Sequence, residues 1–232
     1  MIQFYRNAFL FCLVLFVSGN KGLWATDYHV GPLQPLLSIG EAPWAELITG
    51  DRVYIHWRET PYKEKWVINC NGTAENLIEI IGVNGPDGQQ PVIDGNGATT
   101  VPDVNFWNES RGIIKIGGSN VPEDGLPEYI LIENLEIQSA RPGYFFENDG
   151  EEMEEYSSNA AAIYIEKGAN ITIRNCTMHD AGNGLFIGAY GGDTEVILIE
   201  KNHIYGNGIV GSQYEHNAYT CVTSAKGELL RS

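Results

Sequence analysis

The side chains best suited to chemistry lie in two short polar segments, "HDAGN" and "EHNAYT". Asp180 of the first segment and Glu215 of the second follow apolar runs that look equivalent, which places them in successive repeats. Hydrolysis of a glycosidic bond requires two carboxylates at a fixed separation. His216 adds a candidate general base. We therefore take Asp180, Glu215 and His216 as candidate catalytic residues, although each one alone is also typical of a hydrogen-bonded turn.

Three aromatic residues near these segments are candidates for binding a ligand. Tyr164 in "AAIYIE", Phe186 in "GLFIG" and Tyr219 in "HNAYT" occupy matching positions. Side chains alternate along a strand, so burial of the isoleucines on either side of Tyr164 would turn these rings outward. An exposed aromatic row stacks on sugar rings and predicts a polysaccharide partner. Such a row also stabilises a repetitive fold without a ligand, and a covering by the loop Pro142–Ser158 would favour that alternative.

The type of reaction, if there is one, is open. An elimination on a uronic acid needs a base and a cation that neutralises the carboxylate. No lysine or arginine is expected near the aromatic row, because Arg174 belongs to a different set of strands. This counts against a lyase of the usual type. The candidates are a polysaccharide lyase, a glycoside hydrolase and a non-catalytic surface or structural protein.

An acidic loop precedes the strand of Tyr164. Six of the nine residues from Glu147 to Glu155 are acidic. Oxygen ligands at this density suit calcium, but the spacing of an EF-hand loop is absent. The loop therefore predicts either a calcium site or a solvated surface, and no specific metal ligands.

The elements that must position these residues are short repeated strands. The segments "ILIENLEI", "ITIRNCTM" and "ILIEKNHI" superimpose, so that Ile132, Ile173 and Ile199 align. Ile163 and Leu185 align in a second set of segments, 22 residues apart. Three short strands per repeat, joined by bends, describe one coil of a parallel β-helix, and stacked coils bury a column of side chains that no single coil can bury.

The bends of each coil have their own signal. Asn134 and Asn175 align with Lys201 between two strands, where a tight bend favours a residue that tolerates positive φ. Stacked asparagine side chains can also hydrogen-bond from coil to coil. Glu133, Arg174 and Glu200 align as well and predict a charge ladder that stabilises the stack.

The order of these segments, the asparagine bend and the phrases "PVIDGNGAT", "ITIRNCTMHDAGNGLFIG" and "EHNAYT" resemble a known group. The chain is similar to secreted right-handed parallel β-helix proteins of the pectate-lyase-like superfamily, from about Val30 to Thr220. The resemblance implies an all-β solenoid. It does not choose a function, because the superfamily includes lyases, hydrolases, epimerases and non-catalytic members.

The N-terminus predicts export. Arg6 precedes the unbroken apolar run Ala8–Val17, which is too short to span a bilayer and is typical of a signal peptide at residues 1–25. Cleavage after Ala25 would leave one β-helix domain at residues 26–232, with no membrane span, in the periplasm or outside the cell. Its net charge would move from −16 to −18, which argues against nucleic acid as a partner. The mature chain is expected to be a monomer.

The two ends of the domain carry separate expectations. The segment "SIGEAPWAELITGD" predicts a short capping helix, with Ser38 as its N-cap and Trp44, Leu47 and Ile48 on its apolar side. At the other end, "CVTSAKGELLRS" abandons the repeat after the strand of Tyr219. Solenoids need caps, so the C-terminal coils are expected to be truncated, or Leu229 and Leu230 fold back as a minimal cap.

Overall fold

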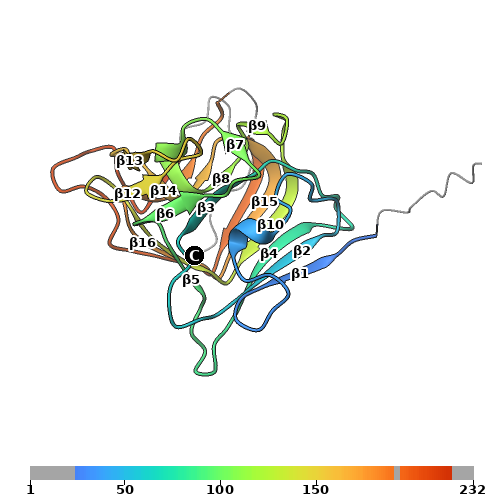
Figure 1. Cartoon of the computed structure of the whole chain (residues 1–232). Coiled ribbons are helices and arrows are strands. Elements are labelled where there is room, and N and C mark those ends of the chain that lie inside the picture. The colour runs from blue at the N-terminus through green and yellow to red at the C-terminus, as the bar shows by residue number, and fades with distance from the viewer. Residues whose placement is uncertain (1–23, 191–193, 221–232) are drawn as a thin grey trace, which may run out of the picture.

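The computed structural model describes residues 24–190 and 194–220 of the chain. Within these residues, short strands gather into three larger sheets, and the chain winds from one sheet to the next (Figure 1). Nearly all strand pairs are parallel; the pairs β12–β13 and β7–β9 are antiparallel. The predicted all-β parallel solenoid is confirmed.

The first two sheets take one strand from each of several successive coils, and the third also has extra strands at one edge. The first sheet contains β1 (Asp27–Val30), β2 (Arg52–His56), β4 (Ile78–Val83), β10 (Glu128–Glu133), β15 (Gly168–Arg174) and β18 (Thr194–Glu200). The second sheet contains β5 (Val92–Asp94), β11 (Glu136–Ala140), β16 (Thr177–Ala181) and β19 (His203–Ile204). The third sheet contains β3 (Glu64–Ile68), β6 (Ala98–Thr100), β8 (Gly112–Ile116), β14 (Ala161–Ile165), β17 (Asn183–Ile187) and β20 (Ala218–Thr220), with the hairpin of β12 (Phe145–Glu147) and β13 (Met153–Glu155) at one edge. The short strands β7 (Asn105–Phe106) and β9 (Ser119–Val121) pair outside these sheets.

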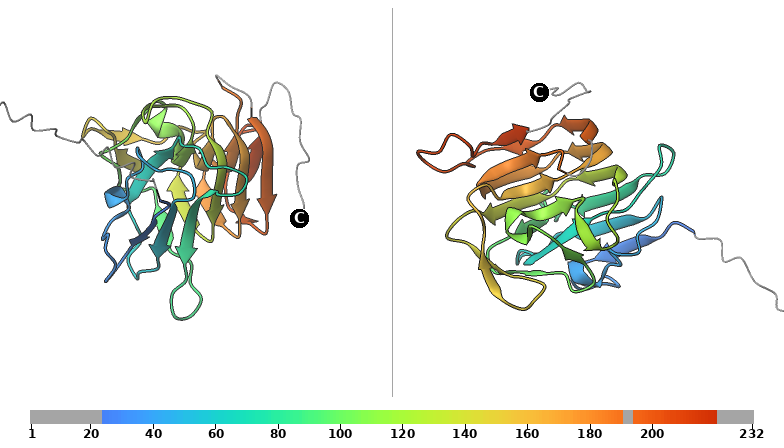
Figure 2. Two further views of the ribbon diagram at one scale, coloured as in Figure 1. Left: turned by 90° about the vertical axis from the view of Figure 1, so that its right-hand side faces the viewer. Right: turned by 90° about the horizontal axis from the view of Figure 1, so that it is seen from above.

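The predicted register of the first sheet is confirmed. Ile132 pairs with Ile173, which pairs with Ile199, and Ile80 extends the row on the other side. The first three are buried or nearly so, and Ile80 is fully buried. Figure 2 shows the strands stacked coil upon coil, with the colours advancing along the stack. The interior is therefore a column of aliphatic rows, as the repeated isoleucines indicate.

The third sheet repeats this arrangement. Ile163 pairs with Leu185, the partner predicted from the 22-residue spacing. Both side chains are fully buried. Because side chains alternate along a strand, the residues that follow each of them point away from the column. The third sheet therefore presents an outward row whose members come from successive coils.

Residues with left-handed backbone angles stack from coil to coil, both at the bend between the first and second sheets and within strands. Three sets share positive φ angles in matching positions: Tyr129, Asn170 and Val196; Asn134, Asn175 and Lys201; and Ser139, Asp180 and Gly206. The prediction of positive φ at the asparagine bend is confirmed. Asn134 also donates from Nδ2 to the Gly82 carbonyl at 2.7 Å and accepts from Asn175 Nδ2 at 2.9 Å. The amide ladder therefore links neighbouring coils.

We expect Asn134→Ala to lower the free energy of unfolding by about 2 kcal/mol. Alanine loses the ladder hydrogen bonds and also resists the positive φ. Asn134→Gly loses the same hydrogen bonds but accepts the backbone angle, so it should cost about 1 kcal/mol less. Urea unfolding of both variants measures this difference, and equal losses would show that the backbone angle contributes nothing.

The predicted N-terminal helix is wrong. The segment contains one turn of 3₁₀ helix, η1 (Ile39–Glu41), and Ser38 makes no side-chain cap. Pro43 explains the early end, because a residue before proline avoids the helical region and Ala42 is extended at ψ 144°. The segment still packs onto the core: the Trp44 ring lies 5.0 Å from the Trp66 ring.

The predicted charge ladder is confirmed, because Arg174 Nε lies 3.7 Å from Glu133 and 3.3 Å from Glu200.

The two ends of the chain carry predictions that the structure does not reach. The signal peptide, except for its last two residues, and the irregular C-terminus lie outside the described residues. No helix among the residues that are described has the length and apolar character needed to cross a membrane.

Candidate functional site

The outward row of the third sheet is the frame of the candidate site. Lys115, Tyr164, Phe186 and Tyr219 pair in register on four successive strands, so the predicted alignment of the aromatic residues is present. The Tyr164 and Phe186 rings meet edge to face at 5.4 Å, and Phe186 stacks on Tyr219 at 5.2 Å. The row is continuous, but its two ends have different access to solvent.

The prediction that Tyr164 is exposed is wrong, since only 4% of this residue is accessible. The covering group is Arg111, which ends the 3₁₀ turn η2 (Glu109–Arg111) and lies 4.9 Å from the Tyr164 ring and 5.0 Å from the Phe186 ring. Burial raises the pKa of Tyr164 to about 12. The Pro142–Ser158 loop joins this cover through a hydrogen bond from Ser157 N to the Ser110 carbonyl.

A buried ion pair lies beneath the cover. Lys115 Nζ is 3.0 Å from Glu166 Oε2, and both side chains are at most 1% exposed. The Lys115 ammonium also donates to the carbonyls of Trp107 and Gly118, and Trp107 Nε1 donates to the other Glu166 oxygen at 2.7 Å. Burial lowers the pKa of Lys115 to about 8, although Glu166 opposes this shift. These groups fix the loop over the sheet.

The hairpin side of the cover is held in a similar way. Lys65 Nζ donates to the Glu109 carbonyl at 2.6 Å and lies 3.3 Å from the centre of the Phe146 ring. Burial lowers the pKa of Lys65 to about 7. Neither lysine is among the site residues predicted from the sequence. The signal was a single lysine within each apolar strand, "EKWVI" and "GIIKI".

The open end of the row forms a pocket of about 400 Å³. Its lining comes from the cover, from the loop before β14, from β17 and from the last described coil: Arg111, Ser158, Asn159, Phe186, Tyr214, Glu215 and Tyr219. Two of the three predicted binding residues and one of the three predicted catalytic residues therefore meet in one cavity. Among its described lining residues, the pocket combines stacked rings with one cation and one carboxylate.

Two polar atoms of this pocket lack a partner within the described part of the chain. Glu215 Oε2 and Arg111 Nε are both buried and make no hydrogen bond there. A buried polar group without a partner is costly, and a bound polar ligand or ordered water removes that cost. The presence of Arg111 also corrects the expectation that no basic residue lies near the row, because the cover loop supplies one. The composition of the site therefore does not count against a lyase.

The other two predicted catalytic residues lie outside the pocket lining. Asp180 is part of β16 in the second sheet, where its carboxylate contacts Arg141 and the Tyr144 hydroxyl. Glu215 lies between β19, which pairs with β16, and β20, which pairs with β17, so Asp180 and Glu215 do fall near the same corner of successive coils, but Asp180 does not line the pocket. The His216 ring stacks on Tyr219 at 5.8 Å, and its Nε2 lies 3.0 Å from the Gln213 carbonyl.

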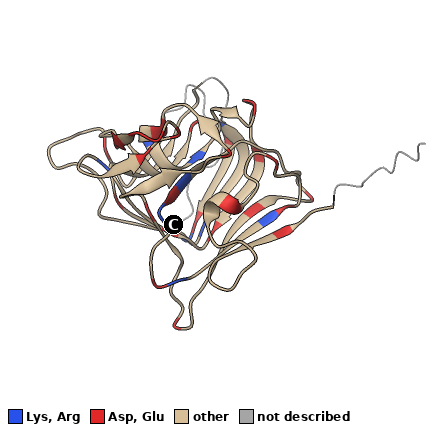
Figure 3. Ribbon diagram, viewed as in Figure 1, with Lys and Arg blue, Asp and Glu red and all other residues tan. Residues whose placement is uncertain are grey.

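The acidic loop forms the hairpin of β12 and β13. Glu155 accepts a hydrogen bond from Gly143 N at 2.7 Å, and Asp149 contacts Asn105. Across residues 24–190 and 194–220, no three His, Cys, Asp or Glu side chains come together as a metal site. Acidic residues nevertheless outnumber basic ones over much of the ribbon (Figure 3).

The fold and the repeated bends define a class, the right-handed β-helix. A family model described as "Right handed beta helix region" matches residues 92–225, which is more than half of the chain. The chain belongs to this family. No match to a curated protein or to a solved structure was found.

Proposed function

We propose that this chain is an exported β-helix protein that binds a polysaccharide in the pocket at the open end of the third sheet. The observation that carries the proposal is the stacked pair Phe186 and Tyr219, both partly exposed, within one cavity that also holds Arg111 and Glu215. The apolar run Ala8–Val17 supports export.

Several features support a saccharide as the ligand. Aromatic faces provide apolar area for a sugar ring, while charged and amide groups at their edge bond its hydroxyls. Arg111 and Asn159 supply donors here, and Glu215 supplies acceptors. The two accessible rings come from successive coils and their centres lie 5.2 Å apart, so a sugar ring can contact both where the row opens to solvent.

The composition of the pocket favours a function in binding a polysaccharide without cleaving it. Among its described lining residues, Glu215 is the one carboxylate, whereas glycoside hydrolysis of the usual kind uses two. The Asp180 carboxylate, the second candidate, is already held by Arg141 and Tyr144. The covered Tyr164 likewise favours a rigid, non-catalytic surface over an open catalytic groove.

The test is binding of the purified chain to a panel of neutral and acidic oligosaccharides, measured by calorimetry. We expect at least one to bind, and Phe186→Ala to weaken that binding about tenfold, because a stacking contact contributes about 1 kcal/mol or more.

Phe145→Ala is the matched control. Phe145 is an exposed phenylalanine of the hairpin, 44% accessible, and does not line the pocket. Its loss should leave the affinity unchanged. Binding that Phe186→Ala and Phe145→Ala weaken equally, or a panel without any ligand, would overturn the proposal.

A further inference from the structure

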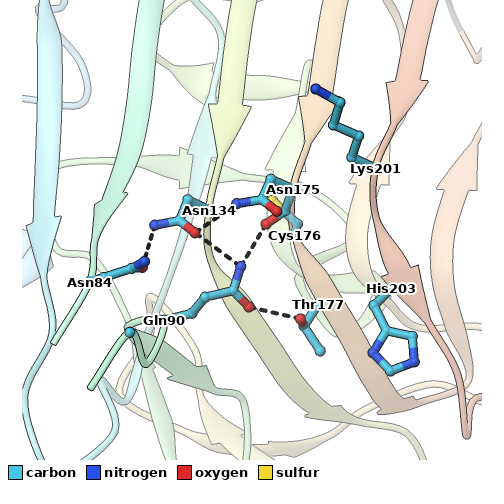
Figure 4. Close-up of a pocket in the computed structure, with 9 residues that line it drawn as sticks. Asn84, Gln90, Asn134, Asn175, Cys176, Thr177, Lys201 and His203 are labelled. Carbon is cyan, nitrogen blue, oxygen red and sulfur yellow. Dashed lines mark hydrogen bonds between the residues drawn. The ribbon is translucent and has the colours of Figure 1, made fainter. Parts of the chain in front are cut away.

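A second cavity lies on another face, at the bend between the first and second sheets. It has a volume of about 430 Å³ (Figure 4). The side chains that matter here are Asn84, Gln90, Asn175, Thr177, Lys201 and His203. Together with Asn134, which also lines the cavity, they come from four coils, through the amide ladder and the strand ends beside it. None of them takes part in the pocket of Phe186 and Tyr219.

The cavity is free of carboxylates among its described lining residues, although the chain has a net charge of −16. The acids next to the lining residues are already engaged: Glu133 lies 3.7 Å from Arg174 Nε, and Asp87 accepts a hydrogen bond from Gln89 Nε2 at 3.2 Å. Glu200, the neighbour of Lys201, lies 3.3 Å from Arg174 Nε, and Glu136, which pairs with Thr177, lies 3.1 Å from His179 Nε2. The local charge is therefore set by Lys201, which contacts no carboxylate in the described part of the chain.

The floor of the cavity is preorganised. Gln90 Nε2 donates to the Asn175 carbonyl at 2.6 Å and to Asn134 Oδ1 at 3.2 Å, while the Thr177 hydroxyl donates to Gln90 Oε1 at 2.7 Å. Figure 4 shows these bonds joined into one network beside Lys201 and His203. A fixed network loses little conformational entropy when a ligand binds.

An aromatic platform continues from the cavity across the second sheet. The His203 ring, which lines the cavity, stacks on Tyr205 at 4.4 Å, and Tyr205 stacks on His179 at 5.0 Å. Tyr205 is 43% exposed. The lining of this cavity thus includes a lysine, several amides and a ring that continues into an accessible aromatic stack.

We infer that this cavity is a second binding site, for a saccharide unit that carries an anionic substituent. Lys201 neutralises the carboxylate or sulfate, the polar floor bonds the hydroxyls, and the platform of His203 and Tyr205 accepts the ring face. The site is separate from the pocket of the proposed function and stands if that function fails.

The test uses three tetrasaccharides in calorimetric titrations. Chitotetraose is neutral, a hyaluronan tetrasaccharide carries carboxylates, and a keratan sulfate tetrasaccharide carries sulfates without carboxylates. We expect at least one anionic probe to bind about tenfold more tightly than chitotetraose, and the better of the two identifies the substituent. Failure of both anionic probes to bind, or equal affinity for all three, overturns the inference.

Lys201→Asn is the decisive variant. It removes the charge but keeps a residue that tolerates the φ of 57° and that occupies the matching positions at Asn134 and Asn175. We expect it to abolish the preference for the anionic probe. Lys63→Asn removes the same charge elsewhere and should preserve the preference. An unchanged preference in Lys201→Asn, or its loss in Lys63→Asn, contradicts the assignment.

Discussion

Lys115→Met is expected to lower the free energy of unfolding by about 3–5 kcal/mol. The substitution leaves the fully buried Glu166 carboxylate without its cation, beneath a cover from which water is excluded. It also releases the carbonyls of Trp107 and Gly118 from the ammonium group. Urea unfolding, followed by tryptophan fluorescence, measures the loss.

The double variant Lys115→Met/Glu166→Gln separates charge from packing. Glutamine is neutral and still offers an oxygen to Trp107 Nε1, so the double variant should recover most of the stability. The single variant Glu166→Gln completes the comparison. If the double variant loses as much stability as Lys115→Met and Glu166→Gln together, the ion pair does not act as a unit, and the account of the cover fails.

Ile173→Ala is expected to cost about 2–5 kcal/mol. Ile173 is fully buried and lies between Ile132 and Ile199 in the aliphatic row, so the cavity left behind touches three coils. Because the neighbouring side chains are held by their own strands, the row has little freedom to close the gap. Urea unfolding again provides the measurement.

Leu198→Ala is the control for this prediction. Leu198 lies on β18 next to Ile199, faces away from the column and is 41% exposed. Removing a comparable number of methyl groups there should change stability by no more than about 0.5 kcal/mol. A loss similar to that of Ile173→Ala would mean that the two faces of the first sheet are wrongly assigned.

The stacked part of the fold could be predicted from the sequence because its signal is repeated. The alignment of Ile132, Ile173 and Ile199 gives the strand register directly, and the asparagines mark a bend that requires positive φ. The N-terminal helix was mispredicted because its apolar spacing outweighed Pro43, which prevents propagation of the first turn.

The cover over the third sheet could not be predicted in the same way. It is formed by loops that occur once, and no repeat relates Arg111 to Tyr164 or Trp107 to Glu166. The alternation of the strands shows that Tyr164 points out of the column, but only the fold of a distant loop decides whether that direction leads to solvent. The same loop supplies the arginine of the pocket.

The sequence placed part of the candidate site correctly. Phe186, Tyr219 and Glu215 line one pocket because register along the stack brings β17 and β20 together. Asp180 was misplaced because a short polar segment, "HDAGN", spans the end of β16 and the start of β17, which belong to different sheets. At such a corner, residues that are close in sequence can belong to different sheets and face different surfaces, as Asp180 of β16 does relative to the residues of β17.

The most direct test of the account is a set of nuclear Overhauser contacts between aromatic rings in isotope-labelled protein. In-register stacking predicts contacts between Tyr164 and Phe186 and between Phe186 and Tyr219, whose ring centres lie 5.4 and 5.2 Å apart, and none between Tyr164 and Tyr219. A shift of one residue would instead place Tyr164 opposite Leu185 or Ile187. Contacts of that kind, or the absence of the predicted pairs, would contradict the stacking from which both binding sites are derived.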